Sequence, residues 1–201
     1  MSNKIIALFV EGPTEIEFYT ALVKYVHDKM ESPFACSFKW LDMHGIGNYK
    51  DKAVRQLRTL KNANSDVEII AVLCIDTDAF EFSPKPPFDK KAVKEALQNQ
   101  GADKVYFIEA KQSIEDWFLL DYEGVLSYLK LPKNTKKPGG SGQDALKKLF
   151  KAKNRMYIKG KKTEGFIKAL DIAKIAAPQC KAIKPLCNAM GANCSKVCGK
   201  K

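Results

Sequence analysis

The sequence lacks any apolar run long enough to cross a membrane, and it is poor in histidine. Its longest uncharged apolar runs, residues 5–10 and 69–75, are far shorter than the roughly 20 residues that a spanning helix needs. No basic, apolar and small-residue signal peptide opens the chain, so we expect a cytoplasmic protein with no membrane partner. The two histidines, His27 and His44, are too few for a histidine-based zinc enzyme.

Two further motifs are missing. No G-x-x-x-x-G-K-[ST] phosphate-binding loop occurs, so an ATPase that works with this protein must be a separate chain. Closely spaced cysteine pairs of the zinc-finger type are lacking, apart from Cys194 and Cys198. The four C-terminal cysteines are separated by six, six and three residues, and Pro185 and Gly191 argue against one continuous helix. Buried or free thiols, a structural zinc site and a redox pair all remain open as interpretations of Cys180, Cys187, Cys194 and Cys198.

The charge is divided unevenly along the 201 residues. Residues 1–122 contain 15 Lys and Arg against 19 Asp and Glu, a net charge of −4. Residues 123–201 contain 19 against 4, a net charge of +15. An acidic body with a basic end is typical of a protein whose carboxylates hold metal ions and whose lysines hold a polyanion. The alternative is a solvated, lysine-rich surface.

Short apolar runs alternate with amphipathic helical patterns, which predicts an α/β protein with a mostly parallel sheet. The expected strands are 4–10, 34–43, 67–75 and 105–110, with the very apolar third strand at the centre. Helices are expected at 14–30, 48–61 and 89–98, and from residue 114 onward, with Asn48, Asp89 and Ser113 as caps.

The remaining segments predict a lid and a helical addition. The proline-rich segment Phe80–Phe88 cannot continue a strand or helix, so it is a candidate lid. Residues 131–142 contain two prolines and three glycines and predict an exposed loop. Helices at 143–153 and 163–177 follow. We therefore expect a catalytic domain at 1–121 and a small, basic, mostly helical C-terminal extension at 122–201.

Acidic residues gather where the predicted strands end. Glu11 and Glu15 follow the first strand, and Asp76 and Asp78 follow the third. Glu115, with Ser113, opens the helix after the fourth strand. Ligands bind at the carboxyl ends of strands in open α/β sheets, and converging carboxylates repel one another unless a cation neutralises them. These oxygen ligands suit Mg²⁺, or Mn²⁺ in its place.

Each acidic cluster also has a purely structural interpretation. Glu11 and Glu15 would complement the positive end of a helix dipole, and so would Glu115 and Asp116. Asp76 and Asp78 would form an ordinary turn after a strand.

The segments Val10-Glu11-Gly12-Pro13-Thr14-Glu15 and Ile75-Asp76-Thr77-Asp78 resemble the Toprim fold of topoisomerases, primases and several nucleases. The likeness covers about residues 4–121 and is closer to the OLD (overcoming lysogenization defect) nuclease branch and its small stand-alone relatives. Glu15 matches the second acid of that branch, and Ser113-Ile114-Glu115 matches its Ser-x-Glu. The turn Gly45-Ile46-Gly47-Asn48 resembles the branch's glycine-bearing turn.

The resemblance implies a nuclease that uses two divalent cations, Mg²⁺ or Mn²⁺, to hydrolyse phosphodiester bonds of DNA or RNA. One ion would lower the pKa of the attacking water, and both would stabilise the attacking and leaving oxygens. Proteins of this branch also use a lysine later in the chain to stabilise the charge of the transition state. In this sequence the candidates are Lys159, Lys161, Lys162 and Lys111, of which Lys159 is slightly favoured. The implied ion ligands are Glu11, Glu15, Asp76, Asp78, Ser113 and Glu115.

Basic residues of the C-terminal region would bind backbone phosphates without sequence preference. They are Lys133, Lys136, Lys137, Lys147, Lys148, Lys151 and Arg155. The role implied by the resemblance lies in phage defence or nucleic-acid repair. The alternative function is a non-catalytic nucleic-acid-binding or regulatory subunit that works with a separate ATPase, but a binder has no need of five convergent acids. A phosphoacceptor receiver domain fits less well, because it needs two acids after the first strand and a lone Asp after the third.

Overall fold

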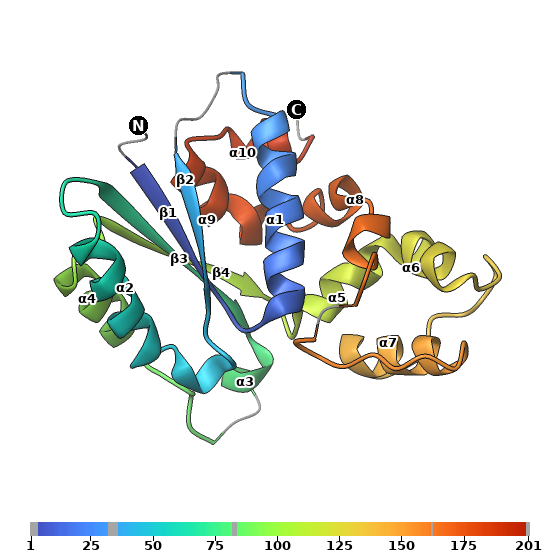
Figure 1. Ribbon diagram of the computed structural model, residues 1–201. Helices are drawn as coiled ribbons and strands as arrows, with labels where there is room; N and C mark the ends of the chain where they lie inside the picture. The colour runs from blue at the N-terminus through green and yellow to red at the C-terminus, as the bar shows by residue number, and fades with distance from the viewer. Residues whose placement is uncertain (1–3, 32–35, 82–83, 162, 200–201) are drawn as a thin grey trace.

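A four-stranded parallel sheet forms the centre of the molecule (Figure 1). The computed structural model describes residues 4–31, 36–81, 84–161 and 163–199. The strands lie in the order β2, β1, β3, β4, and every neighbouring pair is parallel. Their bounds are Lys4–Val10 (β1), Ser37–Asp42 (β2), Glu68–Asp76 (β3) and Lys104–Ala110 (β4). The predicted α/β class with a four-stranded parallel sheet is confirmed.

The two central strands are buried on both faces because they are almost entirely apolar. Successive side chains of a strand point to opposite faces, so each central strand contributes to two hydrophobic cores. In β1 these alternating sets are Ile5, Ala7 and Phe9 on one face, and Ile6, Leu8 and Val10 on the other. β3 divides in the same way, which explains why the third apolar run is central.

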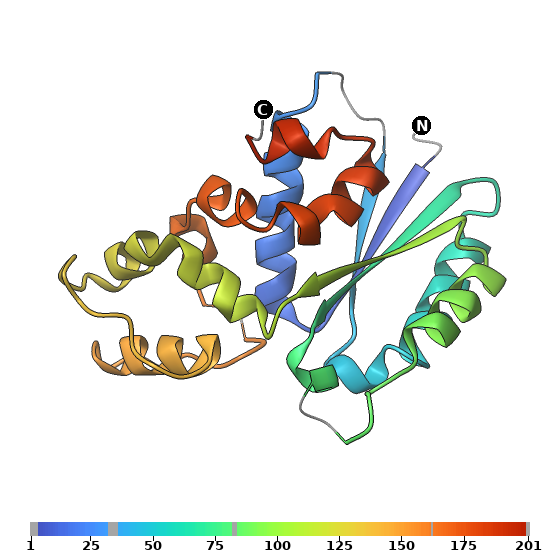
Figure 2. The same cartoon turned by 180° about the vertical axis from the view of Figure 1, so that it is seen from behind.

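Helices cover both faces of the sheet (Figures 1 and 2). One face is covered by α2 (Lys52–Asn62) and α4 (Lys90–Asn99), which contact each other. The other face is covered by α1 (Pro13–Asp28) and by α9 (Cys180–Met190), which contacts β3 and β4. The C-terminal region therefore supplies part of the layer that buries the sheet. The division into domains at residue 121 stays a prediction.

Short helices beyond the carboxyl end of β4 form a lobe to one side of the sheet (Figures 1 and 2). Aromatic rings fill the interior of this lobe, with Phe166 in contact with Phe118, Phe150 and Tyr157. The short helices of this lobe are α5 (Ile114–Phe118), α6 (Tyr122–Leu129), α7 (Gly142–Lys151) and α8 (Ile172–Ala176). Two further short helices lie outside the lobe: α3 (Asp78–Glu81) follows β3, and α10 (Cys194–Val197) contacts α9. Single 3₁₀ turns are η1 (Ile46–Asn48), η2 (Leu119–Asp121) and η3 (Ile167–Ala169).

Two predicted helices differ from the structure. Asn48 does not cap α2: it ends η1, and its side-chain amide donates to the carbonyls of Met43 and His44. The predicted helix at 163–177 is interrupted, because Leu170 is extended and Asp171 caps the separate helix α8. Asp89 caps α4 as predicted, since its carboxylate accepts from the backbone N–H groups of Lys91 and Ala92.

The predicted lid also differs at its start, because Phe80 and Glu81 belong to helix α3. Phe82 and Ser83 lie outside the described residues, as do Phe34 and Ala35 at the predicted start of the second strand.

Across the described ranges, every helix is too short or too polar to span a membrane.

Candidate functional site

Three carboxylates converge at the carboxyl edge of the sheet. Glu11 directly follows β1, Glu15 lies in the first turn of α1, and Asp76 is the last residue of β3. One carboxylate oxygen of each lies within 4.8 Å of the other two. Glu15 and Asp76 are buried, whereas Glu11 is half-buried. The structure thus brings together three of the residues that the sequence selects as metal ligands.

Parallel pairing explains this convergence. Phe9 pairs with Leu73, so the chain two residues further on places Glu11 beside the last residues of β3. The N–H of Glu11 donates to Glu15 Oε2 at 2.7 Å, and the N–H of Ile114 donates to Asp76 Oδ1 at 2.9 Å. Glu15 therefore ties the start of α1 to the end of β1, and one of its carboxylate oxygens still lies near the other two acids.

Burial makes the negative charge of this cluster costly. It raises the pKa of Glu11 and, more strongly, that of Glu15, and nearby acids raise both further. Burial also raises the pKa of Asp76 to about 7, against the opposing effect of Lys159. One lysine therefore does not compensate the three carboxylates, and a further cation would favour their ionised forms.

Lys159 is the predicted lysine that reaches the acids. Its Nζ lies 2.7 Å from Asp76 Oδ2, and Asp76 raises the pKa of Lys159 although burial lowers it. Lys161 lies beside the carboxylates with its backbone carbonyl, which accepts a 2.7 Å hydrogen bond from Thr14 Oγ1. Lys162 lies outside the described residues, and Lys111 is exposed.

The segment 157–161, which we call the strap, passes against the start of α1. A Cβ at Gly12 would lie 3.1 Å from the carbonyl oxygen of Gly160, so the glycine permits this close approach. Thr14 holds the strap from the same turn through its bond to the Lys161 carbonyl. Gly12 and Thr14, just after β1, thus position the strap and with it Lys159. The spacing of these residues in the sequence does not reveal this role.

Glu115 is buried at the start of α5 and has an incomplete set of partners. The Tyr157 hydroxyl donates to Glu115 Oε1 at 3.0 Å. Among the described residues, Glu115 Oε2 is buried without a hydrogen-bond partner. A buried carboxylate oxygen without a donor is costly, so it fits a bound cation or water. Glu115 also raises the pKa of Asp76 and of Glu11, which places it in the same electrostatic cluster.

The acids and Lys159 line two hollows that share that lysine. The first, about 390 Å³ in volume, is bounded by Glu11, Glu15, Glu115, His44 and the strap. The second, about 340 Å³, is bounded by Asp78, Ser113, Asp116 and the start of α7, with Gly140 and Ser141.

Asp78 and Ser113 belong to the second hollow and are absent from the lining of the first. Ser113 occupies the cap position of α5, but its hydroxyl donates to Asp116 Oδ2 at 2.9 Å and makes no capping bond. Asp116 is a site residue that the sequence did not single out from an ordinary first helical turn. Gly142 brings α7 against it, because a Cβ there would lie 2.5 Å from the backbone nitrogen of Asp116.

Basic residues of α7 line a groove that leads to Lys159. Lys147 and Lys151, four residues apart on one exposed side of α7, line this groove of about 680 Å³ with Arg155 and the strap. The Arg155 guanidinium also stacks on the rings of Tyr128 and Phe150. The exposed side chains of Met156 and Ile158 add apolar surface to the groove.

The other predicted phosphate-binding lysines lie elsewhere. Lys148 donates to the Gly139 carbonyl at 2.8 Å. Lys133 lines a hollow with Asp121, Glu123 and Lys174. Lys136 and Lys137 are exposed on the loop before α7. Three of the seven predicted residues, Lys147, Lys151 and Arg155, therefore share one groove with Lys159.

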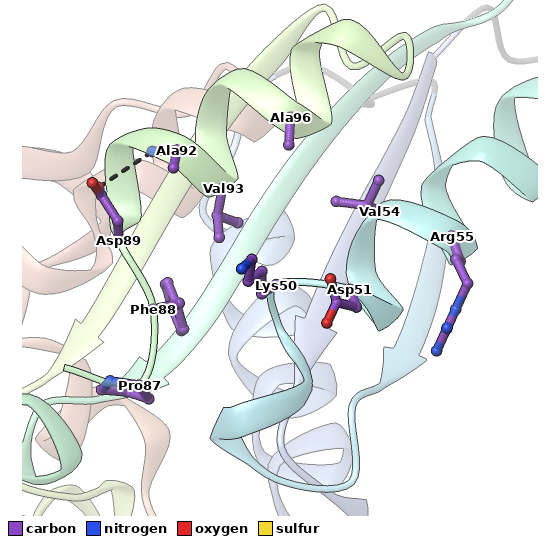
Figure 3. Close-up of a pocket in the computed structure, with 10 residues that line it drawn as sticks. All are labelled: Lys50, Asp51, Val54, Arg55, Pro87, Phe88, Asp89, Ala92, Val93 and Ala96. Carbon is purple, nitrogen blue, oxygen red and sulfur yellow. Dashed lines mark hydrogen bonds between the residues drawn. The ribbon is translucent and has the colours of Figure 1, made fainter. Parts of the chain in front are cut away.

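A larger pocket lies on the other side of the sheet, between α2 and α4 (Figure 3). Its volume is about 750 Å³, and Val54 and Val93 face it from the two helices. Pro87 and Phe88 of the predicted lid line this pocket and are absent from the lining of the acidic hollows. Its Asp89 caps α4, and its other acid, Asp51, shares the lining with Lys50 and Arg55. Neither acid belongs to a group of potential metal ligands among the described residues.

In comparisons with models of protein families, with curated proteins and with solved structures, the chain matched none.

Proposed function

We propose that the protein is a divalent-cation-dependent nuclease that hydrolyses phosphodiester bonds of DNA or RNA. The observation that carries this proposal is the convergence of Glu11, Glu15 and Asp76 within 4.8 Å, next to Lys159. Three acids that meet beside a single lysine keep an excess of negative charge, which favours a hard divalent cation, Mg²⁺ or Mn²⁺.

The donor set fits such ions in two places. Glu11, Glu15, Asp76 and Glu115 offer oxygens at or beside the first hollow, including the unpartnered Glu115 Oε2. Asp78, Ser113 and Asp116 offer oxygens around the second. Cations held there would supply Lewis acidity toward the phosphate and a nucleophilic water at neutral pH.

The protein's own groups would position and stabilise the substrate. The ammonium of Lys159 borders both acidic hollows and the basic groove, so it can stabilise charge that develops on a phosphate during cleavage. Lys147, Lys151 and Arg155 would hold the backbone phosphates that precede or follow the scissile bond. The route from groove to acids thus gives a polyanion a continuous path of positive charge.

The resemblance of the sequence motifs supports the same proposal and narrows the class of nuclease to the Toprim type. The acids that match the Toprim pattern and its OLD branch are the ones at the strand ends, and Lys159 would take the place of that branch's later lysine. We therefore propose a cytoplasmic Toprim-type enzyme that acts on nucleic acid in phage defence or repair.

A cleavage assay tests the proposal directly. The purified chain is incubated with plasmid DNA and with a structured RNA, in Mg²⁺, in Mn²⁺ and in EDTA, beside an Asp76→Asn variant. We expect cleavage that requires both a divalent cation and Asp76. Cleavage in EDTA, or undiminished cleavage by Asp76→Asn, would contradict the metal-dependent mechanism.

The alternative function is a non-catalytic nucleic-acid-binding subunit that works with a separately encoded ATPase. Its signature would be binding of nucleic acid through the basic groove with no cleavage under any metal. The assay is therefore repeated with binding measured on the same substrates, which separates a binder from an enzyme.

A further inference from the structure

The four C-terminal cysteines meet at one end of the molecule, far along the chain from the acidic residues. Cys180 and Cys187 lie on α9, and Cys194 and Cys198 lie at the start and end of α10. Cys180 and Cys187 are seven residues apart and Cys194 and Cys198 are four apart, and both spacings place two residues on one face of a helix. The spacing thus allows each helix to present two thiols to the other. The sequence spacing that does not fit a zinc finger thus fits a pair of short helices.

The turn between the helices makes this meeting possible. α9 continues through Pro185 and ends at Gly191, which adopts the left-handed conformation with φ 73°. Asn193 then caps α10 by accepting from the N–H groups of Ser195 and Lys196. Gly and Asn provide the common stop and start signals for helices, so the sequence itself encodes the hairpin.

Three of the four sulfur atoms lie at separations close to those around a single tetrahedral ion. Sγ of Cys194 lies 3.5 Å from that of Cys180 and 3.9 Å from that of Cys198, and the three sulfurs lie within 4.8 Å of one another. Four sulfurs at about 2.3 Å from one zinc ion are separated by about 3.8 Å along each edge of the tetrahedron. Cys187 lies outside this group of three, but it follows Cys180 by seven residues on the same face of α9, so we take it as the fourth ligand.

The surroundings favour a thiolate-bound cation. The described part of this segment, residues 180–199, contains three lysines and no acidic residue, so the charges nearest in sequence to the thiolates are positive. Cys187 and Cys198 are buried, so two of the four thiols are shielded from solvent. The described cysteines are all free, with no disulfide among them.

We infer that Cys180, Cys187, Cys194 and Cys198 form a structural zinc site. Binding of Zn²⁺ forms four Zn–S bonds and releases the thiol protons to solvent. A four-cysteine site has no open position for substrate, so its role is to fasten α10 to α9. α10 in turn contacts α1, where the Tyr25 hydroxyl donates to the Val197 carbonyl at 2.9 Å. The ion would thus fasten the C-terminal hairpin to the helix that carries Glu15.

Metal analysis of the full chain tests this inference without any activity assay. The protein is expressed in zinc-supplemented medium, purified without chelator and measured by mass spectrometry for elemental content. We expect about one zinc ion per chain in the wild type, a loss of most of it in Cys194→Ser, and retention in Cys36→Ser. Cys36 is a half-buried cysteine outside the hairpin, so it is a matched control. Retention in Asp76→Asn separates this site from the carboxylates.

A second measurement covers the case in which Cys194→Ser fails to fold. Native mass spectrometry of the unaltered chain should show one bound zinc ion, and exchange with Co²⁺ should give the absorption of a tetrahedral thiolate complex. Four free thiols without metal would overturn the site, and so would disulfides between the four cysteines. Iron with labile sulfide would also overturn it in favour of an iron–sulfur cluster.

Discussion

Two clusters of potential metal ligands lie in different settings within this fold, and the contrast is informative. Oxygen ligands gather at the carboxyl edge of the sheet around Asp76, beside hollows and a charged lysine. Sulfur ligands gather between α9 and α10, where two of the four thiols are buried and only cysteines meet. A reactive metal site needs an accessible position for substrate, whereas a structural site is closed.

The contrast teaches that accessibility, rather than the number of ligands, separates the two functions that we propose. The carboxylates combine raised pKa values with an unpartnered buried oxygen on Glu115, so part of their bonding capacity remains free for ions and substrate. The thiols can satisfy one soft ion completely. We therefore expect changes at the acids to abolish chemistry, and changes at the cysteines to weaken the fold.

The largest effect is expected for Asp76→Asn. The amide has the same shape but contributes no negative charge to a divalent cation, so cleavage should fall by about 10²–10³-fold or more. Initial rates of plasmid or RNA cleavage in Mg²⁺ measure the loss. Zinc content and thermal unfolding should show that the variant remains folded.

Glu109→Gln is the matched control for that variant. Glu109 lies on β4, pairs with Lys90 at 2.8 Å on the exposed surface, and is absent from the lining of both acidic hollows. Its rate should stay within about twofold of the wild type, since surface ion pairs contribute little. An equal loss in both variants would show that a general change in charge, and not the acidic site, controls the rate.

Removal of the thiol-bound ion is expected to have the next largest effect. An ion that binds the folded chain adds stability in proportion to its affinity, so its removal by a chelator should lower the free energy of unfolding by roughly 3 kcal/mol or more. For a chain of this size that corresponds to a decrease in Tm of about 6–12 °C. Circular dichroism melts before and after chelation, and after zinc is restored, measure the shift. An unchanged Tm would show that the hairpin is held by packing alone.

Much of the architecture could be predicted from the sequence because hydrophobic periodicity is a local property. The four strands, their parallel arrangement and the Asp89 cap follow from patterns within short windows. The helix expected at 163–177 failed because Asp171 offers its own cap, which competes with continuation of the helix. Asn48 failed as a cap because its amide satisfies carbonyls of the preceding turn.

The candidate site was accessible only in part, since it joins residues that are distant in the chain. The strand-end acids could be selected because parallel strands end at one edge, but Lys159 is 83 residues from Asp76. The choice among four lysines depended on the Gly12–Gly160 approach and on the Thr14 bond, which no local pattern reports. Tyr157 and Asp116 were missed for the same reason.

A smaller effect concerns the pH dependence of stability without divalent cations. The folded state holds the Asp76 proton up to about pH 7, whereas the unfolded state releases it near the usual value of 3.8. Between these values the native state binds more protons, so the free energy of unfolding falls as pH rises, by roughly 2 kcal/mol between about pH 5.5 and pH 8 for Asp76 alone. The raised pKa of Glu15, caused by its burial, acts in the same direction.

Chemical denaturation in EDTA across this range measures the slope. Mg²⁺ should reduce it by stabilising the ionised carboxylates, and Asp76→Asn should flatten it in EDTA. Stability that rises with pH in the absence of metal would show that the acids are already compensated within the protein. The slope thus tests, without any substrate, whether the oxygen cluster carries uncompensated charge.

The smallest effect is expected in the basic groove, because each lysine contributes one phosphate contact among several. Lys147→Gln should weaken binding of an uncut oligonucleotide in EDTA by about 3–10-fold and reduce the salt dependence by about one charge. Lys148→Gln is the matched control on the same helix, because Lys148 is directed to the Gly139 carbonyl and does not line the groove. Fluorescence anisotropy at several salt concentrations measures both variants. Equal losses of affinity in the two variants would mean that the whole surface of α7 attracts nucleic acid. A loss of affinity confined to Lys147→Gln would show that the nucleic acid lies in the groove that leads to Lys159.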